Sequence, residues 1–370
     1  MFIKSIDLQN FRNYEELHLD LGEGIHILYG DNAQGKTNIL EALYMASVSK
    51  SHRQAKDREM IRFGNEEGHI KMISDKKEKE YRIDIHLRAG KNKGIAVNSV
   101  PVKKASEFLG IMNCVLFSPE DLQIVKEGPQ ERRRFIDTEL LQLDRIYLDA
   151  FTKYRKALEQ RNQLLKDISF NYSLIDTLDV WDEQLIFYGK EIIRKRQKFV
   201  EEMNGFSGKI HENLSGGKEK LVLKYEPDVF SEELKERLIS AREKDLKYKT
   251  TTVGPHRDDM SFLLTSSADN NTIDARIYGS QGQQRTCALS LKLAEIELVK
   301  EKAGDTPVLL LDDVLSELDG NRQKYLLESI KDIQTIITCT GLDDFVRNRF
   351  QVNNVYKVVN GKVIKNEQHE

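Results

Sequence analysis

The segment from residue 30 to residue 37 constrains this 370-residue chain more than any other. Its letters, GDNAQGKT, match the pattern G-x-x-x-x-G-K-[ST] at every position. The mostly apolar run 25–29 precedes it and predicts a buried strand, and residues 38–44 predict a helix. In this context the glycines let backbone N–H groups face an anion, which the helix N-terminus also attracts. The segment therefore predicts a phosphate-binding loop, and the alternative is a turn that fits the pattern by chance.

The predicted loop would supply most of a site for ATP and Mg²⁺. We expect Lys36 to reach the β- and γ-phosphates and the Thr37 hydroxyl to join the Mg²⁺ shell. The expected nucleotide-binding residues are Gly30, Asp31, Asn32, Ala33, Gln34, Gly35, Lys36, Thr37 and Asn38.

A second candidate site is the run 308–313, VLLLDD, in which four apolar residues end in two acids. This pattern is typical of a buried parallel strand whose carboxyl end opens onto a ligand. We expect Asp312 to hold Mg²⁺, directly or through water, and Asp313 to orient or deprotonate the attacking water. A strand that ends in a solvated acidic turn is the alternative, and the matched phosphate loop weighs against it.

A third motif, YGSQGQQR at 278–285, is polar and glycine-rich and precedes a long segment of helical apolar periodicity. Ser280 and Gly282 are expected just before that helix, at a second anion-binding N-terminus. Because one nucleotide rarely needs two such ends from one subunit, the motif favours a composite site that contacts the γ-phosphate held by another copy. The residues expected to act in trans are Ser280, Gln281, Gly282 and Gln283.

The order of these motifs resembles the ATP-binding-cassette ATPases, in the branch shared with the SMC proteins. Further stretches, spread over almost the whole chain, are similar to the RecF family of bacterial DNA replication and repair proteins. They are GDNAQGKTN (30–38), SHR (51–53), FSPEDL (117–122), TVGPHRDD (252–259), YGSQGQQR (278–285) and LSELD (315–319). The resemblance implies an ATP-dependent dimer that binds DNA and works with RecO and RecR in loading RecA, in gap repair, replication restart and SOS induction.

Two positions depart from the transporter-type cassette, and a third feature is not evident. Asp313 stands where many relatives carry glutamate, and the segment 337–340, ITCT, has no switch histidine. The glutamine that usually senses Mg²⁺ is not evident, and Glu120 or Gln123 could replace it. These departures bear on hydrolysis and not on nucleotide binding.

The fold class we expect is α/β: an ATP-binding-cassette-type head with an N-terminal antiparallel sheet and an inserted helical lobe. Residues 1–118 and 298–370 would form the ATPase lobe, and residues 119–297 would form the second lobe with the 278–285 motif. Two segments of helical periodicity, 131–167 and 177–203, predict an antiparallel helical hairpin.

The net charge, the cysteines and the apolar runs of the chain limit the partners that it is expected to bind. The net charge is −3, so any DNA contact must come from local basic patches. The three cysteines are scattered and lack metal-ligand spacing, and no apolar run approaches the ~20 residues of a membrane span. We therefore expect a cytoplasmic protein without a membrane partner.

The candidate DNA contacts lie in three basic clusters, each of which could instead be a solvated helical face. They are Arg53, Lys56, Arg132, Arg133, Arg134, Lys190, Arg194, Lys195 and Arg196. Arg53 could alternatively act at the nucleotide. No base-reading module is visible, which favours recognition of DNA backbone or form, such as gapped or junction DNA.

The segment 256–259, HRDD, invites a metal or catalytic interpretation. Read as an extended segment, it would point adjacent side chains to opposite faces, which favours a structural loop.

The resulting hypothesis is ATP-driven dimerisation on DNA, with slow hydrolysis for release and weak DNA-stimulated ATPase activity. A transporter-type ATPase subunit and a non-catalytic ATP-gated scaffold are the alternatives.

Overall fold

A computed structural model describes residues 1–104, 107–341 and 352–366. Within these, the chain divides into two compact units. The first comprises residues 1–121 and 295–370, and the second comprises residues 122–294. The domain bounds expected from the sequence lie close to these, and the functions assigned to the two lobes stay predictions.

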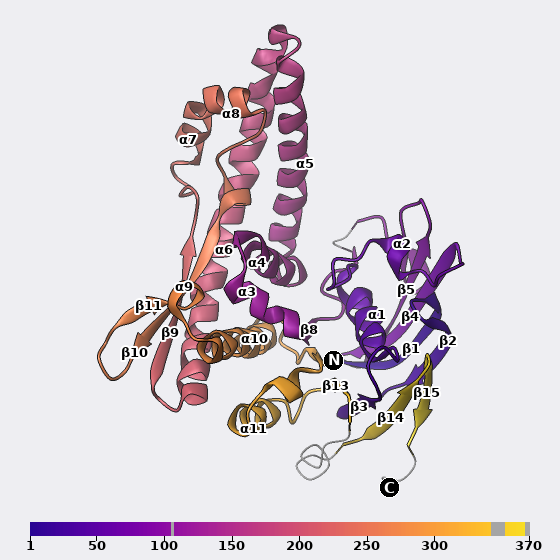
Figure 1. Cartoon of the computed structure of the whole chain (residues 1–370). Coiled ribbons are helices and arrows are strands. Elements are labelled where there is room, and N and C mark those ends of the chain that lie inside the picture. Colours follow the sequence, from indigo (N-terminus) through magenta and orange to yellow (C-terminus); the bar gives the residue numbers. More distant parts are fainter. Residues whose placement is uncertain (105–106, 342–351, 367–370) are drawn as a thin grey trace. The chain divides into compact units, whose positions relative to one another are not determined.

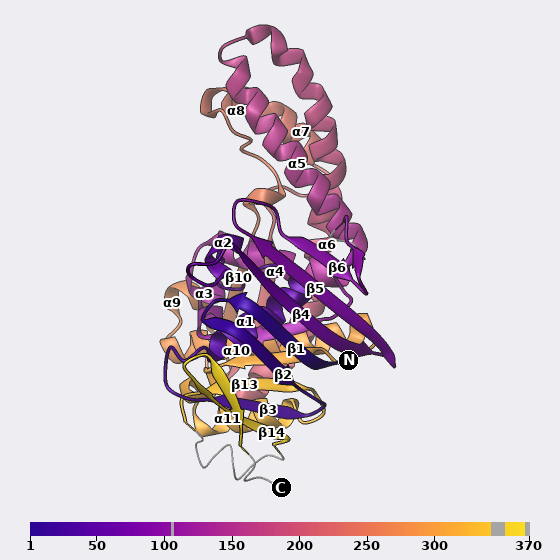
Figure 2. The same cartoon turned by 90° about the vertical axis from the view of Figure 1, so that its right-hand side faces the viewer.

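The first unit contains two six-stranded sheets. The antiparallel sheet has the order β2-β1-β4-β5-β6-β7, and Figure 2 shows its first four strands side by side. Its strands are β1 (Phe2–Phe11), β2 (Tyr14–Asp20), β4 (Glu67–Lys76), β5 (Lys79–Arg88), β6 (Gly94–Val97) and β7 (Val100–Pro101). Alternate side chains of β4 and β5 are buried, as expected for a sheet with one face on a core.

The second sheet of this unit has the order β15-β14-β3-β13-β12-β8. All its pairs are parallel except that of β14 with the edge strand β15. Its strands are β3 (Ile25–Tyr29), β8 (Cys114–Phe117), β12 (Val308–Asp312), β13 (Thr335–Cys339), β14 (Asn354–Val359) and β15 (Lys362–Lys365). The strands β8 and β12 are buried along their whole length, which is why they read as unbroken apolar runs.

Helix α1 (Lys36–Val48) packs against both sheets, and its buried side chains join them into one core. The shorter helical elements of this unit are α2 (Asp57–Met60), η2 (Pro119–Asp121), η5 (Val314–Glu317) and α11 (Gly320–Ser329). The strand predicted at 25–29, the helix that follows the loop and the parallel strand at 308 are all confirmed.

The second unit is built around two long antiparallel helices, α5 (Arg145–Ile168) and α6 (Leu178–Ser215), which Figure 1 shows side by side. The predicted hairpin is thus confirmed. The expected single helix over 131–167 is wrong, because α4 (Pro129–Leu143) ends before Asp144. The Asp144 carboxylate accepts from the N–H groups of Ile146 and Tyr147 and so begins α5 as its N-cap.

The rest of this unit is a three-stranded sheet of order β11-β10-β9 and several shorter helical elements. The strands are β9 (Glu219–Glu226), β10 (Asp259–Ser266) and β11 (Thr272–Asp274). The helical elements are α3 (Leu122–Lys126), η3 (Tyr172–Thr177), α7 (Leu234–Ser240), α8 (Arg242–Tyr248), η4 (Pro255–Arg257) and α9 (Ala275–Tyr278). Helix α10 (Gln281–Ala303) begins in this unit and ends in the first. Among the described residues, no helix is both long and apolar enough to cross a membrane.

Candidate functional site

The predicted phosphate-binding loop joins β3 to α1. The backbone φ is +152° at Gly30 and +115° at Gly35, values that glycine adopts without strain. A Cβ on Gly35 would lie 2.5 Å from Asn13 Nδ2, so a larger residue does not fit there. The Lys36 ammonium donates to the carbonyls of Gly30 at 2.7 Å and Asp31 at 2.9 Å. The loop therefore curls around the cation that is expected to pair with phosphate.

Two turns from outside the loop brace it. The side chain of Asn13 donates to the carbonyl of Gln34 at 2.9 Å, and the Tyr14 hydroxyl donates to that of Gly35 at 3.1 Å. From the β14–β15 turn, the Asn360 N–H donates to the Gln34 side chain at 2.6 Å. Sequence reasoning missed these residues. Their polar turns were visible, but nothing local indicates which distant loop a turn contacts.

Asp312 closes the other side of the site, at the end of β12. Its Oδ1 accepts hydrogen bonds from the hydroxyls of Thr37 and Thr338, each at 2.8 Å. The side chain is 6% exposed, and among the described residues no lysine or arginine pairs with it. Burial raises the pKa of Asp312 above its ordinary value, although the two hydroxyls and the nearby His52 oppose the rise. A buried carboxylate next to Thr37, with hydroxyl donors and no cation, fits a Mg²⁺ ligand.

Asp313 lies at the turn that follows β12. Its φ is +52°, in the left-handed region, and its N–H donates to Thr338 Oγ1 at 3.0 Å. The side chain is partly exposed, as a group that acts on an attacking water must be. Of the two candidates for the Mg²⁺-sensing position, Glu120 lies in η2 and Gln123 in α3, and both are exposed.

The segment after α1 attaches to that helix through the buried Glu41. Arg12 donates to both Glu41 oxygens at 2.7 Å, and the Ser51 hydroxyl donates at 2.5 Å. Burial opposes ionisation, but Arg12 and Ser51 hold the pKa of Glu41 below its ordinary value. Arg53 then lies beside the start of α1, with Nη1 at 3.5 Å from Asn38 Oδ1. This position favours a role of Arg53 at the nucleotide over one in DNA contact.

The segment 278–285 caps α10. The Ser280 hydroxyl accepts from the Gln283 N–H at 3.2 Å, and the Gln283 side chain accepts from the Ser280 N–H at 2.7 Å. This reciprocal pair is a capping box. Gly282 lies within the first turn of α10, so the expectation that it precedes the helix is wrong. Ser280 and Gln281 are exposed, and the neighbouring Tyr278 is 71% exposed.

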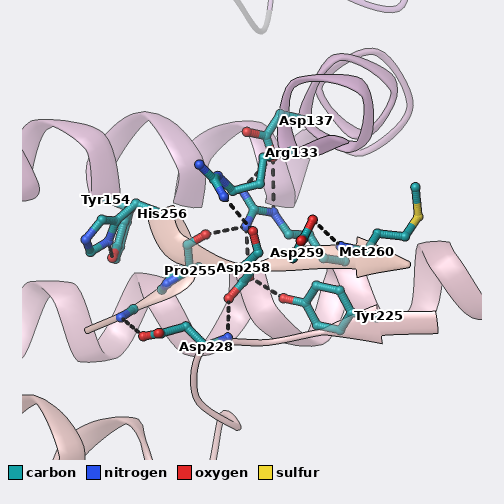
Figure 3. Close-up of polar contacts among 12 residues, drawn as sticks. Arg133, Asp137, Tyr154, Tyr225, Asp228, Pro255, His256, Asp258, Asp259 and Met260 are labelled. Atoms are coloured by element: carbon teal, nitrogen blue, oxygen red, sulfur yellow. Dashed lines mark hydrogen bonds and ion pairs between the residues drawn. The ribbon is translucent and has the colours of Figure 1, made fainter. Parts of the chain in front are cut away.

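The segment 254–259 is the polar centre of the second unit (Figure 3). Asp258 accepts from Arg196 Nη1 at 2.8 Å, from the Tyr225 hydroxyl, and from the Asp228 N–H at 3.0 Å. His256 Nδ1 lies 2.8 Å from the Tyr154 hydroxyl.

The same segment is a 3-10 turn followed by β10, so the expectation of an extended segment is wrong. Its side chains nevertheless diverge to separate partners. The described residues contain no group of three His, Cys, Asp or Glu that could hold a metal. The structure therefore supports the structural interpretation over the metal-binding one.

The DNA candidates separate by exposure. Arg132 and Arg196 are 1% and 2% exposed. Arg132 pairs with Asp259 at 2.6 Å, and Arg196 pairs with Asp137 at 2.7 Å as well as with Asp258. The expectation that these two arginines contact DNA is therefore corrected, because both are buried as the internal partners of acids.

The remaining candidates are accessible to different degrees. Arg53, Lys56 and Arg194 are exposed, and Arg133, Arg134, Lys190 and Lys195 are partly exposed. Of the partly exposed group, Arg133 donates to the Asp258 carbonyl at 2.6 Å and Lys195 pairs with Asp144 at 2.7 Å. Arg134 lies 3.3 Å from Glu131. Among the candidates predicted on α6, Lys190 and Arg194 are thus the best placed to contact a phosphate backbone.

Comparison with known proteins gives a consistent result over the full chain. Residues 2–364 match the family model described as RecF/RecN/SMC N terminal domain. The DNA replication and repair protein RecF of Agathobacter rectalis is 62% identical over 363 residues, which are 98% of this chain and 99% of the relative. The protein of that name from Lachnospira eligens is 57% identical over 366 residues, with 98% and 99% covered.

Solved structures agree. The recombination mediator protein RecF of the RecFOR pathway, solved with ATP, has a TM-score of 0.91 and 38% identity over 99% of this chain and 97% of that chain. The corresponding structure with ATPrS has a TM-score of 0.88 and 37% identity, with 98% and 97% covered. The Smc head domain of Pyrococcus furiosus, at 18% identity and a TM-score of 0.58, covers 99% of this chain and 96% of that chain and shows the shared fold alone.

These matches extend over both units and displace the transporter-type alternative. The chain belongs to the RecF family of DNA replication and repair proteins.

Proposed function

We propose that this chain is an ATP-dependent DNA-binding protein of recombinational repair and replication restart, acting in the cytoplasm. One observation carries the proposal: Thr37 Oγ1 lies 2.8 Å from Asp312 Oδ1, although 275 residues separate them in sequence. Asp312 is the last residue of the parallel strand β12, and Thr37 lies in the first turn of the helix that follows the loop at the carboxyl end of the parallel strand β3. These strand ends are where α/β folds bind nucleotides. The RecF structures solved with ATP and ATPrS support this assignment.

In the proposed site, the N–H groups of residues 30–38 would surround the phosphates, and Lys36 would turn from the loop carbonyls to them. Thr37 and Asp312 would hold Mg²⁺, which would neutralise charge on the phosphates. Asp313 would orient the attacking water.

The second copy would complete the site through Ser280, Gln281, Gly282 and Gln283. Two facts support this. The Ser280 hydroxyl stands at the exposed N-terminus of the 23-residue helix α10, and the neighbouring Tyr278 presents a ring that is 71% exposed. ATP would then close a dimer on DNA, slow hydrolysis would release it, and the dimer would act with RecO and RecR in loading RecA.

Sedimentation of the full chain with ATP and with ADP tests the composite site. We expect a monomer with ADP and a dimer with ATP, and Ser280→Arg should abolish the dimer while ATP binding persists. Ser267→Arg is the matched control, because that serine is exposed in the turn between β10 and β11 of the same unit. A dimer fraction of Ser280→Arg equal to that of the control would refute the composite site.

A non-catalytic ATP-gated scaffold is the second candidate function. It is favoured by Asp313, which stands where many relatives carry glutamate, and by the segment 337–340, which has no switch histidine. Single-turnover hydrolysis with and without gapped duplex DNA separates the two. Phosphate release that DNA accelerates supports a working ATPase, and release at the rate of free ATP supports the scaffold.

A further inference from the structure

The inference concerns Thr338, in the segment where a switch histidine was expected and none is present. Thr338 lies on β13, the strand between β3 and β12, opposite Leu28 on one side and Asp312 on the other. Its side chain is completely buried. It therefore stands next to both parts of the proposed site without being able to contact a phosphate.

The Thr338 hydroxyl is engaged on both sides. It donates to Asp312 Oδ1 at 2.8 Å and accepts from the Asp313 N–H at 3.0 Å. A hydroxyl has one proton, and the Leu311 carbonyl at 3.5 Å is a much poorer acceptor for it than the Asp312 carboxylate. The hydroxyl thus joins the side chain of one acid to the backbone of the next.

Each of the two Thr338 contacts stabilises a local feature that is unfavourable by itself. The Asp313 backbone is in the left-handed region at φ +52°, which is unfavourable for a residue with a Cβ unless other contacts hold it. Asp312 is a buried carboxylate whose oxygens need hydrogen-bond donors. Thr37 is its other hydroxyl donor, but the proposed function requires Thr37 to turn toward Mg²⁺.

We propose that Thr338 is a positioning residue that holds Asp312 and Asp313 in their working orientations through the hydrolytic cycle. The proposal rests on the proposed nucleotide site. When Thr37 leaves Asp312, the Thr338 hydroxyl stays as the donor that keeps Oδ1 oriented. Removing this hydroxyl should weaken metal binding through Asp312 and slow the hydrolysis that depends on Asp313. The phosphate loop should remain intact.

The test uses substitutions that separate the hydroxyl from the volume of the side chain. Thr338→Val removes the hydroxyl at nearly the same volume, Thr338→Ser keeps it, and Thr338→Ala carries the test if the valine variant does not fold. Thr335→Val is the matched control, because Thr335 lies on the same strand, is equally buried, and donates to the Ile333 carbonyl at 3.0 Å.

Two readouts are needed on the full chain: the affinity for ATPγS with Mg²⁺ and with EDTA, and the rate of ATP hydrolysis. For Thr338→Val we expect the gain in affinity from Mg²⁺ to fall about tenfold and hydrolysis to fall about 10- to 100-fold. The affinity in EDTA should be unchanged. Thr338→Ser and Thr335→Val should resemble the parent.

Parental Mg²⁺ dependence and hydrolysis in Thr338→Val would overturn the inference and leave the proposed function standing. Equal losses in Thr335→Val would also overturn it, because the effect would then belong to the strand and not to the hydroxyl. If the parent itself binds no nucleotide, both the inference and the proposed function fail.

Discussion

Two buried aspartates, one in each unit, have opposite surroundings. Asp258 is 1% exposed and accepts from the Arg196 guanidinium, the Tyr225 hydroxyl and a backbone N–H. Asp312 is 6% exposed and accepts from two threonine hydroxyls only, among the described residues. Burial raises the pKa of both. The first carboxylate already has its cation, and among the described residues the second pairs with no lysine or arginine.

The difference distinguishes a structural acid from a functional one. A buried ion pair that is fully hydrogen-bonded holds elements together, and here the pair of Arg196 with Asp258 joins α6 to the segment before β10. A buried carboxylate with no cation is kept at a cost in stability, which a bound metal ion would offset. Adjacent acids stand at 258–259 and at 312–313 in the sequence, and the partners of Asp258 and Asp312 in the structure distinguish the two pairs.

The largest expected effect on stability comes from removing the cation that pairs with the structural acid Asp258. Arg196→Met would leave the buried Asp258 and the partly buried Asp137 without the guanidinium that they share, so we expect a loss of about 3–5 kcal/mol in the free energy of unfolding. Urea denaturation measures it. Arg194→Met, on the exposed face of the same helix, should change stability by less than ~0.5 kcal/mol. Similar losses of stability in Arg196→Met and Arg194→Met would contradict the structural role given to the Arg196–Asp258 pair.

The next effect concerns ATP hydrolysis at the proposed nucleotide site. Asp313→Asn should bind ATP as the parent does but hydrolyse it at least about 100-fold more slowly, since an amide cannot act as a base. It should therefore accumulate as an ATP-bound dimer. Lys36→Met is the contrasting variant, because it removes the cation expected at the phosphates and should weaken binding itself. Quench-flow and nucleotide binding distinguish the two, and parental hydrolysis by Asp313→Asn would disprove the assignment.

A smaller effect follows from the raised pKa of Asp312. Its native state holds a proton to higher pH than the unfolded chain does, so the ionised carboxylate reduces stability increasingly as pH rises above its ordinary pKa of about 3.9. Without nucleotide, Asp312→Asn should therefore be more stable than the parent at pH 7, by about 1 kcal/mol. The gain should shrink as the pH is lowered toward the ordinary pKa, because protonation of the parent carboxyl removes the cost of burying its charge.

Denaturation of both proteins across this pH range is the measurement. A stability difference that stays constant with pH would show that ionisation of Asp312 is not its cause.

The smallest effect concerns DNA. Neutralising Lys190 and Arg194 with glutamine should lower the slope of log affinity against log salt by about 0.9 for each DNA phosphate that the variant no longer neutralises, with stability unchanged. Lys244→Gln with Lys247→Gln on α8 makes the same change in charge and is the control. Fluorescence anisotropy on gapped duplex over a salt series, with ATP and with ADP, measures it. Equal slopes for the parent and both variants would exclude this face of α6 from the DNA surface.

Local patterns predicted the parts of the site that local sequence determines. The strand at 25–29 and the run ending at Asp312 are short buried apolar segments, and the glycines of the loop take positive φ values that other residues rarely adopt. The break between α4 and α5 was also readable in principle, because Asp144 is a favoured N-cap residue inside a continuous periodic segment.

Long-range partners could not be predicted in this way. Arg132 and Asp259 are 127 residues apart, and Arg196 and Asp258 are 62 apart. A basic cluster on a helix looks the same in sequence whether its cations face solvent or buried acids. The bracing of the phosphate loop by Asn13 was hidden for the same reason, since periodicity describes a face of an element and not what covers it.

The role of Asp312 is tested most directly by the affinity of the full chain for ATPγS with Mg²⁺ and with EDTA, in the parent and in Asp312→Asn. If Asp312 holds the metal, Mg²⁺ should raise the affinity of the parent by at least about tenfold, and the variant should lose most of that gain while keeping the affinity seen in EDTA. A variant that retains the full gain from Mg²⁺ would contradict the assignment of Asp312 as the metal-holding acid.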